Sequence, residues 1–289
     1  MLTTLPTTPE KAAYDSCARQ ARRHYENFPV ASILLPRALR RPVAAIYAYA
    51  RSADDIADEG GLDGATRLAL LDVYRHQLES IEQGGTPTTP LFVALADTIR
   101  THALPLQPFY DLLAAFRQDV TQTRYADFDE LAQYCRRSAN PVGRLLLRLF
   151  RCDSEENIAL SDAVCTGLQL TNFLQDVCAD YARGRIYLPL DALRAHGVTP
   201  DDIPARRFGP GWQRLINSEI ERARSQLRYG ARLGSHLTGR FGMEIRLTIA
   251  GGLTILDKLQ TINGQRFITG TRLTPMDWLR VLWRSHDIR

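Results

Sequence analysis

The sequence predicts an all-α protein, on the strength of three observations. Apolar residues recur at spacings of three and four along most of the chain, which is the period of one helix face. No run of residues alternates apolar and polar side chains between hairpin turns, as a half-buried strand would. Clusters of glycine and proline, which break helices, separate the periodic segments.

The expected helices follow one another between these breaks. Residues 212–234 give the clearest pattern, because their apolar positions fall at spacings of three and four and most charged side chains fall elsewhere. A last helix is expected from Pro275, since Thr274 and Asp277 stand at good helix-start positions. The other expected helices span residues 10–26, 42–59, 64–83, 90–102, 108–120, 127–150, 155–182 and 240–260. The breaks are GGLDG (60–64), EQGGTPTTP (82–90), LPLQP (104–108) and HGVTPDDIPARRFGPG (196–211).

The size of the chain favours a single domain, residues 1–289. Its 289 residues, with 45% hydrophobic content, can bury one sizeable core. The breaks between helices do not resemble flexible interdomain linkers. No stretch approaches the roughly 20 apolar residues that span a bilayer, and the amino-terminal MLTTLPTTPEK lacks the basic and hydrophobic segments of a signal peptide. We therefore expect a cytoplasmic protein.

Cysteine usage and charge argue against several classes of function. The five cysteines are an odd number and form no C-x-x-C pair, which argues against a disulfide framework and a zinc site. The net charge of +4 would suit an anionic partner. The arginines are dispersed, however, and no nucleic-acid-binding motif is present, so we expect no nucleic-acid partner.

The segment RSADDIADEG, residues 51–60, places an acidic stripe at the end of a half-buried helix. Four residues nearly close one helical turn, so Asp54 and Asp58 project from the same face, with Arg51 and Tyr47 further back along it. Two carboxylates about 6 Å apart repel by roughly 0.7 kcal/mol in water and about 3 kcal/mol at an effective dielectric constant of about 20. Solvated helix faces often carry this spacing, but a partly buried pair needs a counter-ion.

A second polar stripe lies in GLQLTNFLQDVCADYARGRIYLP, residues 167–189. Its members are Gln169, Asn172, Asp176 and Asp180. A polar stripe on an otherwise apolar helix lines a cavity rather than facing bulk water. If the two stripes face each other, their carboxylates converge on one pocket and supply the hard oxygen ligands that Mg²⁺ prefers.

Arginines beside both stripes point to a diphosphate as the second binding partner. Arg51 precedes the first acidic pair by one turn, and Arg183 and Arg185 follow the second stripe. Guanidinium groups can bind phosphate oxygens at two points. The alternative is that these arginines pair with neighbouring aspartates at solvated helix ends.

Three segments resemble the squalene/phytoene synthase family of head-to-head isoprenoid synthases: YAYARSADDIADE, YCRRSANPVGRLL and QLTNFLQDVCADYARGRIYLP. Within it, HYENFPVASILLP (24–36) and YCRRSANPVG (134–143) are most similar to the bacterial hydroxysqualene synthase branch of hopanoid biosynthesis. The resemblance covers nearly the whole chain. It implies an all-α isoprenoid synthase fold with two aspartate-rich helices facing each other across a central cavity.

The resemblance also implies roles for individual residues. The implied catalytic residues are Asp54, Asp58, Asp176 and Asp180, which together with Asn172 would hold Mg²⁺. The implied substrate contacts are Tyr47, Arg51, Gln169, Arg185, Tyr187 and His24.

The chain departs from the family pattern at two places. Where many relatives have a serine-rich, basic diphosphate-binding segment, residues 24–27 read His-Tyr-Glu-Asn. Where they have the second tyrosine of a YCxY pattern, this chain has Arg137. Both departures fit a substrate that already carries the joined carbon skeleton and only one diphosphate, namely presqualene diphosphate.

The resemblance therefore implies a hydroxysqualene synthase, a Mg²⁺-dependent lyase that ionises presqualene diphosphate and captures the rearranged cation with water. The alternative is a squalene or phytoene synthase that condenses two prenyl diphosphates such as farnesyl diphosphate. A remoter alternative is a non-catalytic helical assembly factor, which would not need both aspartate motifs. Enzymes of the same pathway are further candidate partners.

The carboxyl-terminal LTPMDWLRVLWRSHDIR mixes large apolar side chains with arginines. Such a helix can lie in a membrane interface, which would make the protein peripheral at the inner membrane face. The alternative is a last helix that simply packs on the core, since its apolar face is short.

Overall fold

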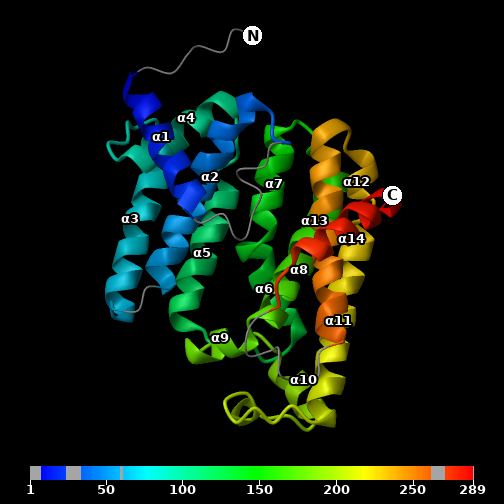
Figure 1. Cartoon of the computed structure of the whole chain (residues 1–289). Coiled ribbons are helices and arrows are strands. Elements are labelled where there is room, and N and C mark those ends of the chain that lie inside the picture. Colours follow the sequence, from blue (N-terminus) through cyan, green and yellow to red (C-terminus); the bar gives the residue numbers. More distant parts are fainter. Residues whose placement is uncertain (1–7, 24–33, 59–60, 262–270, 289) are drawn as a thin grey trace. The chain divides into compact units, whose positions relative to one another are not determined.

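The computed structural model describes residues 8–23, 34–58, 61–261 and 271–288, and these residues form helices and no strand (Figure 1). The predicted all-α class is confirmed. His24, which the resemblance implied as a substrate contact, lies outside the described residues. The helices are α1 (Thr8–Arg23), α2 (Arg37–Asp58), α3 (Gly64–Glu82), α4 (Pro90–His102), α5 (Gln107–Thr121), α6 (Phe128–Ser138), α7 (Asn140–Leu149), α8 (Glu155–Gln175), α9 (Val177–Ala182), α10 (Leu190–Ala195), the 3₁₀ turn η1 (Pro200–Asp202), α11 (Pro210–Gly230), α12 (Leu233–His236), α13 (Gly239–Gln260) and α14 (Pro275–Asp287).

The chain divides into two compact units. The first unit comprises Met1–Thr121 and Leu145–Cys152, and the second comprises Gln122–Arg144 and Asp153–Arg289. The division passes through α7, whose first half belongs to the second unit. That residues 1–289 fold as one domain stays a prediction.

Helix α2 is the centre of the first unit, where it contacts α1, α3, α4 and α5. Its buried face is rich in alanine, which lets neighbouring helices approach closely. Among its large side chains Tyr49 is fully buried, lies edge-on to Phe92 and Phe109, and donates a hydrogen bond from its hydroxyl to the Phe109 carbonyl oxygen at 3.0 Å. This packing holds the carboxyl-terminal turns of α2, and the acidic stripe on them, against a rigid core.

The second unit is built on the pairing of α8 with α11, and both helices also contact α13. Gly230 of α11 makes the close approach possible, because a Cβ atom there would come within 2.6 Å of Val164 Cγ2 and 2.8 Å of the Leu160 carbonyl oxygen. Helix α14 packs on α13. None of the helices in the described ranges is both long and apolar enough to cross a membrane.

At three places the helices differ from the prediction at a proline or an aspartate, and α11 also ends at Gly230, before the predicted end at residue 234. Helix α2 begins at Arg37 although Pro42 had been taken as the start. The predicted helix 127–150 is two helices that break at Ala139, because the Pro141 ring cannot follow a preceding helical turn without a clash. The predicted helix 155–182 breaks at Asp176, a residue type that favours helix ends.

Candidate functional site

The first acidic stripe lies where α2 ends. Ala53 and Ala57 face the core, whereas Tyr47, Arg51, Asp54, Asp55 and Asp58 lie half-buried on the other side of the helix. Arg51 Nη2 lies 2.6 Å from Asp55 Oδ1, and Arg51 Nη1 lies 3.6 Å from Asp54 Oδ2. The guanidinium therefore pairs with neighbouring aspartates, which is the alternative that the sequence left open. Its Nε atom is nevertheless buried and has no hydrogen-bond partner among the described residues.

The charge on this stripe is only partly balanced. Burial is the largest cause that raises the pKa of Asp54 from 3.8 to about 7, followed by the charge of Asp58. Asp119 and Asp55 contribute smaller parts of this rise, and Arg51 opposes it. Burial also raises the pKa of the Tyr47 hydroxyl. The Asp54 side chain is 38% exposed, so solvent screens part of this repulsion. A divalent cation would relieve the rest.

Asp119 is an acidic member of this cluster that the sequence interpretation missed. It lies in α5 and is 6% exposed, and its charge acts on Asp54. A signal was present, because Asp119 continues the apolar stripe that includes Phe109, Leu112 and Phe116 at helical spacing. An aspartate at a position that the periodicity marks as buried is a candidate functional residue.

The second polar stripe runs across the break between α8 and α9. The Asp176 amide donates to the Asn172 carbonyl oxygen at 3.0 Å, and the Asp180 amide donates to the Asp176 carbonyl oxygen at 2.8 Å. In each of these hydrogen bonds an amide donates to the carbonyl oxygen four residues earlier, so the helical spacing continues across the break. Successive members of the stripe therefore remain one turn apart. Asn172 and Asp176 are exposed, while Gln169 and Asp180 are half-buried. The structure thus brings these four residues together within the second unit.

Two arginines act electrostatically on Asp176. Partial burial raises the pKa of the Asp176 carboxyl, and the charges of Arg183 and Arg272 oppose that rise. Arg183 had been considered a diphosphate contact, but Arg272 had not. No sequence signal marked it, because Arg272 precedes α14 as an isolated basic residue nearly a hundred positions from the stripe.

Backbone hydrogen bonds fix the segment after the second stripe. The Arg185 amide donates to the Asp180 carbonyl oxygen at 2.8 Å, and the Ile186 amide donates to the Thr123 carbonyl oxygen at 3.0 Å. Arg124 Nη1 donates to the Gly184 carbonyl oxygen at 2.6 Å. Arg185 is only 9% exposed, so this guanidinium is held inside the protein rather than at a solvated helix end.

A buried aromatic cluster lies directly behind the second stripe. Tyr187 stacks on Phe173 with ring centroids 3.9 Å apart and on Tyr125 at 5.8 Å, and Tyr134 lies tilted beside it at 5.8 Å. Since Phe173 follows Asn172 on α8 and Tyr187 follows Arg185 by two residues, the cluster joins the stripe to the arginine segment. The resemblance implied Tyr187 as a substrate contact but gave no sign of the cluster around it.

Whether these residues could bind a metal ion depends on the oxygen atoms that their side chains offer. Across the described part of the chain, no three or more histidine, cysteine, aspartate or glutamate side chains are grouped so that they could hold a metal ion. Mg²⁺ is usually bound by one or two carboxylates, water and phosphate oxygens rather than by a closed protein cage. Each stripe offers such a partial, hard-oxygen set, and in the first stripe the charges of Asp58, Asp119 and Asp55 act on Asp54 against the single opposing charge of Arg51.

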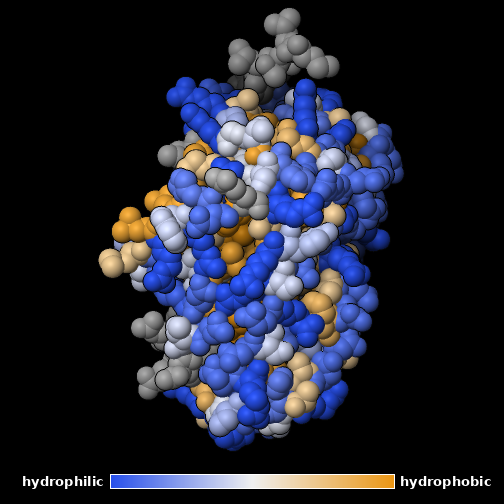
Figure 2. Space-filling view, turned by 90° about the vertical axis from the view of Figure 1, so that its right-hand side faces the viewer, coloured by the Kyte–Doolittle hydropathy of each residue, from blue (hydrophilic) through white to orange (hydrophobic). Residues whose placement is uncertain are grey.

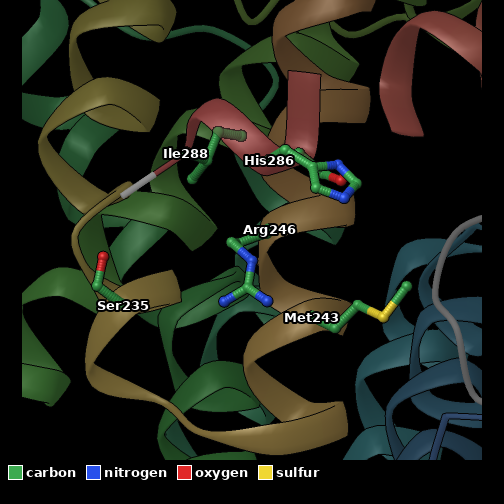
Figure 3. Close-up of a pocket in the computed structure, with 6 residues that line it drawn as sticks. Ser235, Met243, Arg246, His286 and Ile288 are labelled. Atoms are coloured by element: carbon green, nitrogen blue, oxygen red, sulfur yellow. The ribbon is translucent and has the colours of Figure 1, made fainter. Parts of the chain in front are cut away.

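A pocket of about 390 Å³ in the second unit is separate from the predicted residues. It is lined by Ser235, Met243, Arg246, Ser285, His286 and Ile288 (Figure 3). Arg246 lies between Ser235 and Met243 in this group. None of the lining residues belongs to either polar stripe, so this pocket is not the candidate active site.

Comparison with known proteins places these features in a family. A family model described as squalene/phytoene synthase matches residues 21–280. A hydroxysqualene synthase from Rhodopseudomonas palustris is 39% identical over 82% of this chain and 80% of its own. A phytoene synthase from Arthrospira platensis is 36% identical over 73% of this chain and 72% of its own.

A solved structure agrees with this assignment. The crystal structure of squalene synthase HpnC from Alicyclobacillus acidocaldarius superposes with a TM-score of 0.82 and 41% identity, and the match covers 88% of this chain and 95% of that one. The all-α isoprenoid synthase fold is therefore confirmed. The chain belongs to the squalene/phytoene synthase family.

Proposed function

We propose that the chain is a hydroxysqualene synthase that ionises presqualene diphosphate with the help of Mg²⁺ and adds water to the rearranged cation. Its family makes it an isoprenoid synthase with prenyl diphosphate substrates. The names of the relatives are compatible with two reactions, hydroxysqualene synthesis and phytoene synthesis, because the two relatives are nearly equally similar to this chain. The choice between these reactions therefore depends on the chemistry of particular residues.

Arg137 is the observation that carries the choice. It lies half-buried on α6, one turn after Tyr134 of the aromatic cluster. A guanidinium stays protonated in proteins and so cannot remove a proton from a carbon as a phenolic side chain could. An enzyme with arginine here is better suited to discharging a cation with water than to the proton abstraction that condenses two prenyl groups.

The proposed roles are those that the resemblance to the family implies for each group. Asp54, Asp58, Asp176, Asp180 and Asn172 would hold Mg²⁺, which when bound neutralises charge on the departing diphosphate. Arg51 and Arg185 would donate hydrogen bonds to phosphate oxygens, and Gln169 would add a neutral donor. Tyr47 and Tyr187 would line the same region, and His24 would contact the diphosphate.

The reaction balances without a redox partner. The carbon–oxygen bond to the diphosphate breaks and its electron pair leaves with the diphosphate. The cyclopropylcarbinyl cation then rearranges, a water oxygen forms the new carbon–oxygen bond, and the water proton leaves to solvent. The rings of the cluster, Tyr125, Tyr134, Phe173 and Tyr187, supply an apolar wall whose electron-rich faces favour a nearby cation.

Product analysis tests this proposal. The purified protein is given presqualene diphosphate and Mg²⁺ with and without NADPH, and farnesyl diphosphate in a parallel reaction, and the products are identified by mass spectrometry. Hydroxysqualene from presqualene diphosphate, in a yield that NADPH does not change, is the expected result. Turnover of farnesyl diphosphate to a condensed product would instead identify a condensing synthase and remove the argument from Arg137.

A further inference from the structure

Helix α14 exposes a face of large apolar side chains. Its most exposed members are Met276 at 79%, Trp283 at 75% and Leu279 at 68%, and these three are also the most exposed large hydrophobic residues in the described part of the chain. Trp278 and Leu282 extend the same face. Residues 276, 279 and 283 follow helical spacing, so the exposed side chains form a continuous stripe rather than scattered single residues.

The opposite face of α14 already has its packing partner. Val281 and Ser285 are buried, four residues apart, where the helix contacts α13. Two ion pairs fix the sides of the helix: Arg284 Nη1 lies 2.6 Å from Asp257 Oδ2, and Lys258 Nζ lies 2.6 Å from Asp277 Oδ2. The helix therefore does pack on the core, as one interpretation of the sequence predicted, but it does so with its other face. The apolar stripe remains outside.

Basic side chains lie beside the stripe, together with one acidic side chain. Arg280 is exposed on its flank, with Asp287 nearby at the end of the helix. On α14 itself, His286 lines the pocket shown in Figure 3, together with Arg246 of α13. Figure 2 shows hydrophobic side chains protruding at mid-height on the left-hand edge of the surface, and Figure 1 places α14 at that height. An apolar stripe with cationic groups beside it is complementary to a lipid surface that has a hydrocarbon interior and anionic headgroups.

We propose that α14 is a membrane-docking helix that lies flat in the surface of an anionic lipid bilayer. Its 13 residues extend about 20 Å, which is too short to cross the roughly 30 Å hydrocarbon core, but its apolar face can enter the interface. Tryptophan, present twice on the face, favours this zone. Arg280 and the pocket residue Arg246 would meet the headgroups.

Membrane docking through α14 would help an enzyme of this family to reach its substrates. Prenyl diphosphate substrates carry long apolar chains and a charged end, so they collect in membrane interfaces, and a docked enzyme would take them up there. This proposal does not depend on which reaction the chain performs. A second copy of the chain is the competing occupant of the stripe, and the experiment separates the two.

Vesicle binding of the full-length protein tests the proposal. Flotation is measured with vesicles of phosphatidylcholine alone and of an equal mixture of phosphatidylcholine and phosphatidylglycerol. The wild type is expected to float with the mixed vesicles, and the Leu279→Ser/Trp283→Ser variant to bind them about tenfold or more weakly. The matched control is Leu70→Ser/Val73→Ser on α3, which changes two other exposed apolar residues and is expected to bind as the wild type does.

Two further measurements make the outcome specific. The chain has three tryptophans, and Trp212 is buried, so a blue shift of the emission on adding vesicles reports on Trp278 and Trp283. Reversing the flanking charge with Arg280→Glu is expected to weaken binding to the mixed vesicles about fivefold. Thermal unfolding confirms that each variant is folded.

Three results would overturn the membrane proposal. One is a Leu279→Ser/Trp283→Ser variant that is folded and floats as well as the wild type, and another is a wild type that does not float. The third is a wild-type dimer, seen by light scattering, that this variant dissociates while no form binds vesicles, which would assign the stripe to a second copy.

Discussion

The Asp54→Asn variant is expected to lose turnover by on the order of 1000-fold while it unfolds at the same or a higher temperature. Asparagine keeps the shape and polarity of the side chain but removes a charge that Asp58, Asp119 and Asp55 all repel. A residue that lowers stability and raises activity serves function rather than folding. Steady-state kinetics and calorimetry on the same preparation give both values.

Asp72→Asn is the matched control in the same unit. Asp72 lies on α3, where its Oδ1 atom is 2.7 Å from Arg117 Nη1 and 3.2 Å from Arg75 Nη2. Its removal is expected to leave turnover unchanged and to lower the free energy of unfolding by about 1 kcal/mol or less, because the pair is partly exposed. If Asp54→Asn kept full activity, or lost stability as Asp72→Asn does, the functional role of the first stripe would be wrong.

The pH dependence of stability adds a second readout for Asp54. Its pKa rises from 3.8 in the unfolded chain to about 7 in the folded protein. Between these values the folded state binds more protons than the unfolded state, so the wild type loses stability relative to Asp54→Asn as pH rises through this window. Denaturant unfolding of both proteins in the absence of metal measures the difference. A difference that does not change across the window would show that Asp54 is solvated.

The second large effect is expected at the other stripe. Asp176→Asn should also lose turnover by on the order of 1000-fold, because it removes a hard oxygen charge from the proposed metal ligands. Asp162→Asn is the control on the same helix, where Asp162 binds Arg144 through two hydrogen bonds of 2.9 and 2.6 Å. That variant should be less stable but fully active.

The double variant tests whether both stripes serve one site. If Asp54 and Asp176 act on the same metal and diphosphate, then Asp54→Asn/Asp176→Asn should be little worse than either single variant, since losses from groups that act as a unit do not add. Multiplied losses would mean that the two units contribute independently. The measurement is single-turnover kinetics with each of the four forms.

The helical fold was predictable because amphipathic helices repeat their apolar residues at a regular spacing. The apolar stripe of α11 and the capping box of Thr274 and Asp277 are local patterns, and the structure has both. The breaks at Ala139 and Asp176 were not predicted. The ring of Pro141 disrupts the helical turn before it, so the break lies ahead of the proline itself. Asp176 interrupts the helix at one residue only, so the spacing of the apolar residues does not reveal the break.

Spacing along one helix predicted which polar residues are neighbours, but it could not predict which separate elements meet. Arg51 lies beside Asp54 as the sequence indicated, and the four residues of the second stripe lie together. Asp119, Arg272 and the rings around Tyr187 come from other helices and loops, and only the folded chain brings them close. A tertiary contact of this kind leaves no fixed spacing in a single sequence.

Capture of the cation by water is the central claim, and isotope labelling tests it most directly. The enzyme is given presqualene diphosphate and Mg²⁺ in water enriched in oxygen-18, and the product is analysed by mass spectrometry. The account predicts one heavy oxygen in each hydroxysqualene molecule. A product without heavy oxygen, or a hydrocarbon formed by loss of a proton or gain of hydride, would contradict it.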